Sequence, residues 1–275
     1  MKSSHQIYLI SDSTGETLDR IFLALKAQFL NFKYELYHFS FTRTENQMLK
    51  ILEKTKQNEN PIILYTIVNN KLAKFLTEQT NKKKIPCFGV LGDLISNFST
   101  ILNQKASHEP SGQHVLNKEY YDRIEAIQFT MNHDDGNKVD DIEKSDILLI
   151  GVSRTSKTPT SIYLANRGYK TSNIPIINDK SIPKKIIDKN FKPCIVGLIY
   201  EAERLHDVRK NRLSLLKEND NTGYVDINLI KKELKNSKKL FKKNQWPTID
   251  VTRKSVEETA ASVIKIYEIK NKKNG

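Results

Sequence analysis

The hydrophobic positions in the first third of the chain alternate between two patterns. Short apolar runs typical of strands are each followed by a stretch in which apolar side chains recur at helical spacing, as Leu18, Phe22 and Leu25 do. The strands predicted in this way are residues 6–10, 36–41, 61–68 and 85–91, and the helices are residues 16–30, 45–56 and 70–82. Such alternation predicts a mostly parallel sheet covered by helices.

The same alternation returns after a less regular stretch at residues 92–145. Helices are expected within that stretch at 93–103 and 119–131, and a polar turn is expected at the HDDG segment, residues 133–136. Beyond it, the predicted strands are 147–150, 174–177, 194–199 and 248–251, and the predicted helices are 160–166, 182–189, 203–217, 228–241 and 255–269. We place the domain change within residues 134–144, which gives two α/β domains, residues 1–140 and 141–275.

A polar loop directly after the strand at 147–150 is the most specific local pattern. Residues 151–158 read GVSRTSKT, which fits the phosphate-loop pattern G-x-x-x-x-G-K-[ST] except that Ser156 replaces the second glycine. The loop lies between a predicted strand and a predicted helix that Pro159 opens. In this arrangement the backbone N–H groups of the loop and of the helix start can bind an anion. The residues expected to bind a nucleotide are Gly151, Val152, Ser153, Arg154, Thr155, Ser156, Lys157 and Thr158. The alternative is a polar turn whose hydroxyls merely cap the helix.

The residue types in and around this loop indicate phosphoryl transfer. Lys157 carries a mobile ammonium that can follow phosphoryl oxygens, and Thr158 offers a hydroxyl to Mg²⁺. Asp179 ends a predicted strand and is the candidate metal-side carboxylate, with a simple turn as its alternative. Asp134 and Asp135 are candidates for the catalytic base or for Mg²⁺ ligands, against an inert Asp-Gly turn. The second half is therefore expected to be a P-loop-type α/β kinase region that follows the N-terminal parallel-sheet region.

A second polar segment follows the first strand. Ser11, Asp12, Ser13 and Thr14 lie where parallel sheets bind ligands, and they could hold a phosphate of the target or free phosphate. The alternative is a helix N-cap by Ser13 or Thr14. His108, His114 and His133 are too scattered to predict a zinc site, and an acid–base role for His114 or His133 is a secondary hypothesis.

Composition narrows the compartment and the partners. The chain has 275 residues, a formal net charge of +13 and only two cysteines, with no CxxC pattern, and this cysteine usage predicts a reducing, cytoplasmic setting. No apolar stretch has the length of a membrane span, and the apolar run near the N-terminus covers only residues 7–10, so neither a membrane span nor a secretory signal is expected. The positive charge is carried mainly by scattered lysines, so a solvated surface is the first interpretation and docking of an acidic partner protein the alternative. Sparse arginine argues against a nucleic-acid partner.

Six segments together resemble one known family. They are residues 11–17 (SDSTGET), 120–129 (YYDRIEAIQF), 133–136 (HDDG), 151–170 (GVSRTSKTPTSIYLANRGYK), 196–205 (VGLIYEAERL) and 246–261 (WPTIDVTRKSVEETAA). The chain resembles the pyruvate, phosphate dikinase regulatory proteins, a family also called the phosphoenolpyruvate synthase regulatory proteins. Ser156 is then a family trait of the loop. The segment 85–114 departs from the family pattern, which leaves Asp93 and His114 without a transferred role.

The resemblance implies a bifunctional Ser/Thr protein kinase and phosphorylase. Such enzymes phosphorylate a threonine of the dikinase near its phosphohistidine, with ADP as donor and AMP as product. They remove the phosphate with inorganic phosphate as acceptor, which releases pyrophosphate. The alternatives are the same chemistry on phosphoenolpyruvate synthase, a P-loop kinase of small molecules, or a nucleotide-sensing module without catalysis. Whether the chain forms a homo-oligomer is left open by the sequence.

Overall fold

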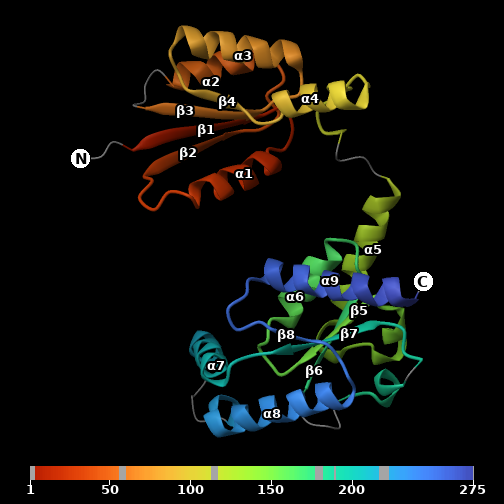
Figure 1. The fold of residues 1–275 in the computed structure, drawn as a ribbon. Coiled ribbons are helices and arrows are strands. Elements are labelled where there is room, and N and C mark those ends of the chain that lie inside the picture. The colour runs from red at the N-terminus through yellow and green to blue at the C-terminus, as the bar shows by residue number, and fades with distance from the viewer. Residues whose placement is uncertain are drawn as a thin grey trace. The chain divides into compact units, whose positions relative to one another are not determined.

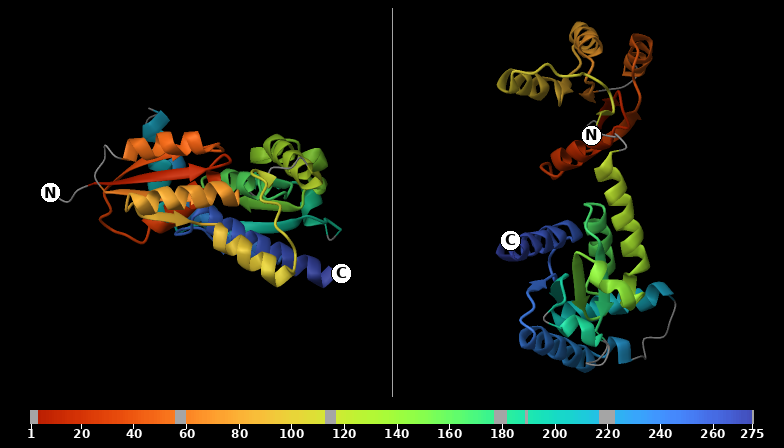
Figure 2. Two further views of the ribbon diagram at one scale, coloured as in Figure 1. Left: turned by 90° about the horizontal axis from the view of Figure 1, so that it is seen from above. Right: turned by 90° about the vertical axis from the view of Figure 1, so that its right-hand side faces the viewer.

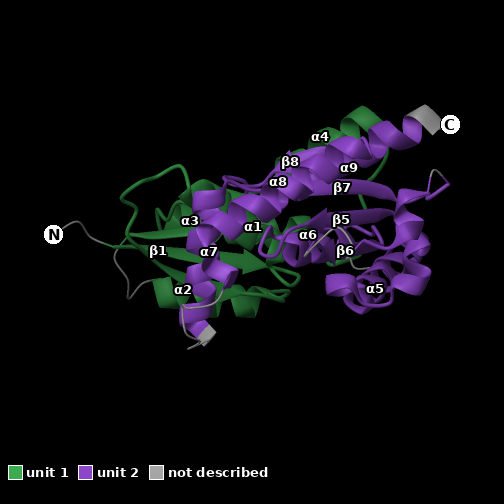
Figure 3. Ribbon diagram, turned by 90° about the horizontal axis from the view of Figure 1, so that it is seen from below, with its two compact units in different colours: residues 1–115 green, residues 116–275 purple. Residues whose placement is uncertain are grey.

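The chain forms two compact units, residues 1–115 and 116–275 (Figure 3). The computed structural model describes residues 4–55, 60–112, 117–176, 182–188, 190–216 and 223–274. Both units consist of parallel strands with helices on the sheet faces, which confirms the predicted α/β class. Within the described residues, no helix is both long enough and apolar enough to cross a membrane.

The sheet of unit 1 has the strand order β2-β1-β3-β4, and every neighbouring pair is parallel (Figure 1). Ile7 and Leu9 face α1, while Tyr8 and Ile10 face α2 and α3, so strand alternation buries both faces. The elements are β1 His5–Ser11, α1 Glu16–Lys26, β2 Tyr34–Phe39, α2 Glu45–Thr55, β3 Pro61–Thr66, α3 Asn70–Lys82, β4 Cys87–Gly89 and α4 Gly92–Leu102.

The sheet of unit 2 repeats this arrangement with the order β6-β5-β7-β8. In both units the first strand in sequence is central, and its carboxyl end leads into a polar loop and a helix. The elements are α5 Lys118–Asn132, η2 Asp134–Gly136, η3 Val139–Lys144, β5 Ile147–Gly151, α6 Lys157–Ala165, β6 Thr171–Pro175, η5 Lys184–Ile187, β7 Cys194–Ile199, α7 Ala202–Leu216, η6 Gly223–Val225, α8 Ile227–Lys243, β8 Thr248–Asp250 and α9 Val256–Asn274.

Helices cover both faces of the second sheet (Figure 1, Figure 2). Leu149 and Leu198 pack against α6 and α9 on one face, while Leu148 and Ile150 pack against Phe241 of α8 on the other. Gly197 permits the approach of α8, because a Cβ at this position would come within 2.7 Å of the Phe241 ring. The central strands are buried throughout, which accounts for their unbroken apolar runs.

Two features of unit 2 differ from the sequence-based expectation. The helix expected at 182–189 is only the short 3₁₀ turn η5, which Pro183 precedes in an extended conformation. The chain divides into its two compact units after residue 115, whereas the sequence analysis placed the domain change within 134–144. Helix α5 belongs to unit 2 because it contacts α6 and β6, and Thr130 Oγ1 there accepts a hydrogen bond of 3.0 Å from the Thr171 N–H.

A candidate phosphate-binding site

The loop between β5 and α6 begins with a close approach that only glycine allows. A Cβ on Gly151 would lie 2.7 Å from the carbonyl oxygen of Leu198 on the neighbouring strand and 2.8 Å from Thr155 Oγ1. The loop then turns through Arg154 and Ser156, whose φ angles of 70° and 59° are left-handed. The position at which Ser replaces the second glycine of the pattern is thus one whose backbone favours glycine.

The backbone amides of this loop have no protein acceptor among the described residues. Ser156 is the N-cap of α6 with no hydrogen bond from its side chain, so the structure does not support hydroxyl capping as the purpose of the loop. Throughout the described residues, no hydrogen bond is donated by a backbone N–H group of residues 153–158. Free N–H groups at the start of a helix, beside a small-residue loop, are the usual binding site for a phosphate.

Lys157 is buried beneath the loop, with 5 % of its surface exposed. Its Nζ donates a hydrogen bond of 3.1 Å to the carbonyl oxygen of Val152, which holds the ammonium at the base of the loop. Burial lowers the pKa of Lys157 from 10.5 to about 8; Asp135 and Asp134 oppose this shift, and Arg154 adds to it. A bound phosphate would supply the counter-charge that the ammonium lacks.

The two candidate carboxylates lie beside Lys157 but in different surroundings. Asp134 Oδ1 accepts hydrogen bonds from Thr158 Oγ1 at 2.9 Å and from the Asn173 side-chain amide. Asn173 also holds the backbone of Asp135, whose N–H donates to Asn173 Oδ1 at 3.0 Å. Among the described residues, no hydrogen bond reaches the Asp135 carboxylate, and this side chain is exposed. The backbone of Asp135 is left-handed, with φ at 54°. The Asp134 carboxylate is therefore held in place by hydrogen bonds, whereas that of Asp135 has no hydrogen-bond partner among the described residues.

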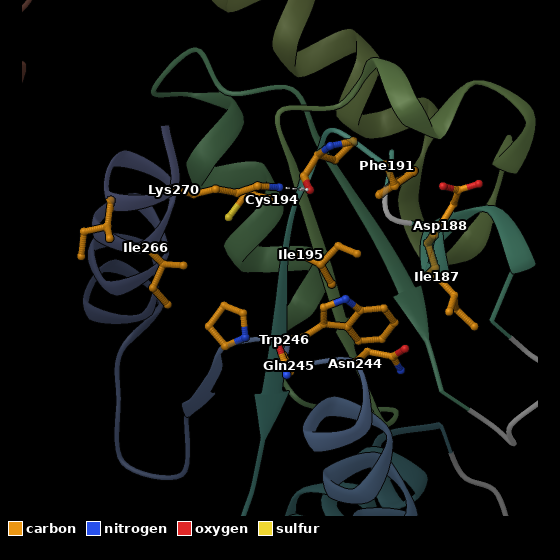
Figure 4. A pocket seen from close by; sticks show the side chains of 14 residues that line it. Ile187, Asp188, Phe191, Cys194, Ile195, Asn244, Gln245, Trp246, Ile266 and Lys270 are labelled. Atoms are coloured by element: carbon orange, nitrogen blue, oxygen red, sulfur yellow. Dashed lines mark hydrogen bonds between the residues drawn. The ribbon is translucent and has the colours of Figure 1, made fainter. Parts of the chain in front are cut away.

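Both carboxylates and the loop line one pocket of about 310 Å³. The residues that line it are Asp134, Asp135, Ser153, Arg154, Ser156, Lys157, Thr158, Pro159 and Val208. A larger pocket of about 580 Å³ lies at the other end of the sheet, where β7 begins at Cys194 (Figure 4). Its lining is mainly apolar, with Trp246 facing Ile195, and its one ammonium, that of Lys270, donates to two backbone carbonyls. The smaller pocket is the one with groups suited to phosphate chemistry.

A buried arginine beneath the loop was missed by sequence analysis. Arg209 on α7 is 1 % exposed and donates to the carbonyl oxygens of Ser153 at 3.3 Å and Tyr224 at 3.1 Å. Its Nη2 lies 2.7 Å from Glu233 Oε2 on α8, and its guanidinium lies 4.7 Å from the centre of the Tyr224 ring. The Tyr224 hydroxyl in turn accepts a hydrogen bond of 3.1 Å from Arg154 Nε. Arg209 thus fixes the loop to two helices that lie far beyond it in sequence.

Replacing Arg209 by Met is expected to lower the free energy of unfolding by about 3 kcal/mol, because two carbonyl oxygens and a carboxylate lose their donor inside the protein. Glu233 is 32 % exposed and can rehydrate, which limits the loss. Urea unfolding followed by circular dichroism measures the change. The control is Arg212→Met, an exposed arginine of the same helix, for which a change within about 0.5 kcal/mol is expected. Equal unfolding midpoints for the two variants would contradict the assigned role of Arg209.

The segment after β1 forms a separate polar pocket of about 180 Å³ in unit 1, lined by Ser11, Asp12, Ser13 and Thr14 among others. The N-cap of α1 is Gly15, with no hydrogen bond from a side chain, so capping by Ser13 or Thr14 is not observed. Ser13 Oγ instead lies 2.8 Å from Ser111 Oγ. Burial raises the pKa of Asp12, although its carboxylate accepts the Val68 N–H at 2.8 Å.

The other candidate residues are placed as follows. The ring of His133 is buried, with Nδ1 2.7 Å from the Phe129 carbonyl oxygen and Nε2 2.7 Å from Asp141 Oδ1, so it braces the end of α5 rather than facing the pocket. Asp179 and His114 lie outside the described residues. In the part of the chain that is described, no cluster of three or more His, Cys, Asp or Glu side chains is arranged to hold a metal ion.

The fold and the comparisons with known proteins define a class of protein, an α/β phosphotransferase, and the loop between a central parallel strand and a helix is its candidate phosphate-binding site. The model of the kinase/pyrophosphorylase family matches residues 7–264, and the chain belongs to this family. A relative from Pelagibacter ubique is 66 % identical over the full length of both chains, and one from Chelativorans sp. is 44 % identical over 96 % of each. A relative from Wolbachia is 42 % identical over 95 % of this chain and 96 % of its own. All three are named as pyruvate, phosphate dikinase regulatory proteins, which confirms the resemblance inferred from the sequence.

Proposed function

We propose that the chain is a bifunctional regulator of pyruvate, phosphate dikinase that acts on one threonine of that enzyme. It transfers the β-phosphoryl group of ADP to the threonine, which inactivates the dikinase, and it removes the group again with inorganic phosphate. The names of the relatives support the choice of partner. The observation that carries the proposed chemistry is a single pocket lined by the loop, Lys157 and Asp135, in which the loop amides and the Asp135 carboxylate have no hydrogen-bond partner among the described residues.

In the phosphorylating direction, the threonine oxygen attacks the β-phosphorus of ADP. A new O–P bond forms as the bond to the bridging oxygen breaks, the electron pair leaves with AMP, and the threonine proton passes to the Asp135 carboxylate. The loop amides of residues 153–158 and Lys157 neutralise the charge on the moving group. The exposure of Asp135 suits this role, because a protein substrate must reach the proton acceptor.

The reverse direction uses the same pocket. An oxygen of inorganic phosphate attacks the phosphorus of phosphothreonine, pyrophosphate is released, and the threonine oxygen takes the proton that Asp135 carries. The acceptor phosphate binds where the α-phosphate of the nucleotide binds in the phosphorylating direction. The same loop amides therefore serve both directions. The polar pocket of residues 11–14 is the proposed second anion site, for free phosphate or for a phosphate of the target.

Mg²⁺ fits this site as a partner of the nucleotide rather than as a permanently held ion. Thr158 and Asp134 supply one hydroxyl and one carboxylate, and Mg²⁺ commonly takes its remaining ligands from water and phosphate oxygens. Its chemical contribution would be to neutralise charge on the phosphates. Asp179 remains the proposed further carboxylate.

The test is incubation of the protein with purified dikinase and ADP that carries a label in its β-phosphate. Label on a dikinase threonine, located by mass spectrometry, and release of that label as pyrophosphate on addition of phosphate are the expected results. The same assay with phosphoenolpyruvate synthase identifies the target. Label on a metabolite would indicate a small-molecule kinase, and nucleotide binding without transfer would indicate a sensing module; either result would overturn the proposal.

A further inference from the structure

A groove lined by lysines lies between the start of α7 and helix α8. Its volume is about 550 Å³, and its floor includes Tyr200, Ala202 and the buried Leu234. The lysines that line it are Lys231, Lys235, Lys238, Lys239 and Lys242, all of them exposed. Helix α8 as a whole carries seven lysines and one glutamate. The density of lysines in this lysine groove is therefore higher than the lysine-rich composition of the chain alone would produce.

The lysines of the groove outnumber the carboxylates near them. Glu201 also lines the groove, and the Asp250 carboxylate interacts electrostatically with Lys238. Lys231 pairs with Glu203 at 3.0 Å, and no ion pair forms with the other four ammonium groups in the residues that the structure describes. Lys231, Lys235 and Lys239 follow one another at intervals of four residues, and Lys238 and Lys242 repeat that spacing. Like charges at this spacing weaken a helix, so the arrangement costs stability that an anionic partner would restore.

One end of the lysine groove, at Tyr200 and Lys231, lies at the same edge of the sheet as the phosphate loop. From there the groove follows α8 to Lys242, two residues before Asn244 of the apolar pocket at the other end of the sheet. Tyr200 follows directly on β7, and Leu198 near the end of that strand is paired with Gly151, where the loop begins. Val152 of the loop packs in one hydrophobic cluster with Leu234 and Tyr200 from the groove floor. A protein whose threonine enters the phosphate pocket therefore passes close to the lysine groove.

We propose that the lysine groove docks an acidic segment of the protein substrate, which extends the proposed function and rests on it. Lys231 and Lys242 are eleven residues apart, or about 16 Å along the helix, which matches roughly five residues of extended polypeptide. The half-buried floor around Tyr200 suits one apolar side chain within that segment. The lining contains no arginine, the residue that stacks on bases and grips phosphates in planar fashion, which favours a protein partner over a nucleic acid.

The test compares two variants that change the net charge equally. Lys235→Glu/Lys239→Glu/Lys242→Glu reverses the lysine groove, and the control Lys82→Glu/Lys118→Glu/Lys265→Glu reverses three exposed lysines elsewhere. At low salt, the groove variant should bind the dikinase about tenfold more weakly and show a KM for it raised by a similar factor, with kcat and ADP affinity unchanged. The defect should shrink at about 0.5 M salt, where the screening length is only a few ångströms. The control should stay within about twofold of the parent.

Several outcomes would overturn the docking role. One is an equal loss of dikinase affinity in the two variants, and another is no loss in either. A third is that the parent protein binds a labelled oligonucleotide, the groove variant loses this binding, and both proteins bind the dikinase with equal affinity. Direct binding is measured without phosphoryl transfer, so the docking role is tested even if ADP proves not to be the donor. Absence of transfer by the parent would instead contradict the proposed reaction.

Discussion

Replacing Lys157 by Met is expected to slow phosphoryl transfer in both directions by about 10²–10³-fold, because the variant loses the buried ammonium at the base of the phosphate loop. Met keeps most of the buried stem, so circular dichroism and the unfolding midpoint should show an intact fold. The measurement is the rate of transfer from labelled ADP to the dikinase at saturating concentrations. Transfer at the rate of the parent, in a variant fully occupied by ADP, would contradict the role of Lys157.

The pKa of Lys157 provides a control that does not depend on catalysis. In the free protein this pKa is about 8, against 10.5 for an exposed lysine, so folding releases a proton and stability rises with pH between these values. Phosphates restore the charged form. Binding of ADP at about pH 8.5 should therefore take up a proton and should weaken as the pH rises further. Calorimetry in two buffers of different ionisation enthalpy measures this uptake, which Lys157→Met should lack.

Asp135→Asn is expected to reduce kcat for transfer by about 10²–10⁴-fold, since the amide cannot accept the proton of the threonine. The affinity for ADP should be retained or slightly increased, because a negative charge near the phosphates is removed. Single-turnover transfer measures the first effect and calorimetry the second. The free carboxylate of Asp135 is the physical basis of this expectation.

The matched control is Asp134→Asn. The Asn side chain keeps an oxygen that can accept from Thr158 and Asn173, so the pocket should retain its shape. Its principal effect is expected on the magnesium dependence of ADP binding, with a smaller loss of kcat than in Asp135→Asn. The assignment of the base fails if Asp135→Asn transfers phosphate as fast as the parent or if Asp134→Asn is the slower of the two variants.

Much of the fold follows from local periodicity, and the exceptions have physical causes. The predicted strand 194–199 and helix 70–82 have the bounds of β7 and α3. Helix α5 was predicted as a helix but assigned to the wrong unit. Its membership depends on packing against β6, a strand that begins some forty residues later, and no local pattern reports such a contact.

The residues of the candidate site that lie within one segment could be predicted from the sequence. Those contributed by distant segments could not. Residues 151–158 form the expected loop after β5, and the HDDG segment supplies both carboxylates to its pocket. The helix predicted at 203–217 gives no sign of the role of Arg209, since Glu233 on the next helix and the carbonyls of Ser153 and Tyr224 are what make its burial tolerable. The burial of this arginine could be predicted only from its hydrogen-bond partners. These lie between fifteen and fifty-six residues away in sequence, so no local pattern contains them.

The left-handed backbone at Ser156 has a consequence for the loop at rest. Glycine there would relieve about 1 kcal/mol of steric cost but would also give the unfolded chain more conformations, worth about 0.4–1 kcal/mol in the opposite direction. The two effects nearly cancel, so serine costs the protein little stability. What serine contributes is stiffness, because a residue with a Cβ has few other conformations to visit. In the proposed function, the amides of the loop would then be in place before the nucleotide arrives, and binding would have little ordering left to impose.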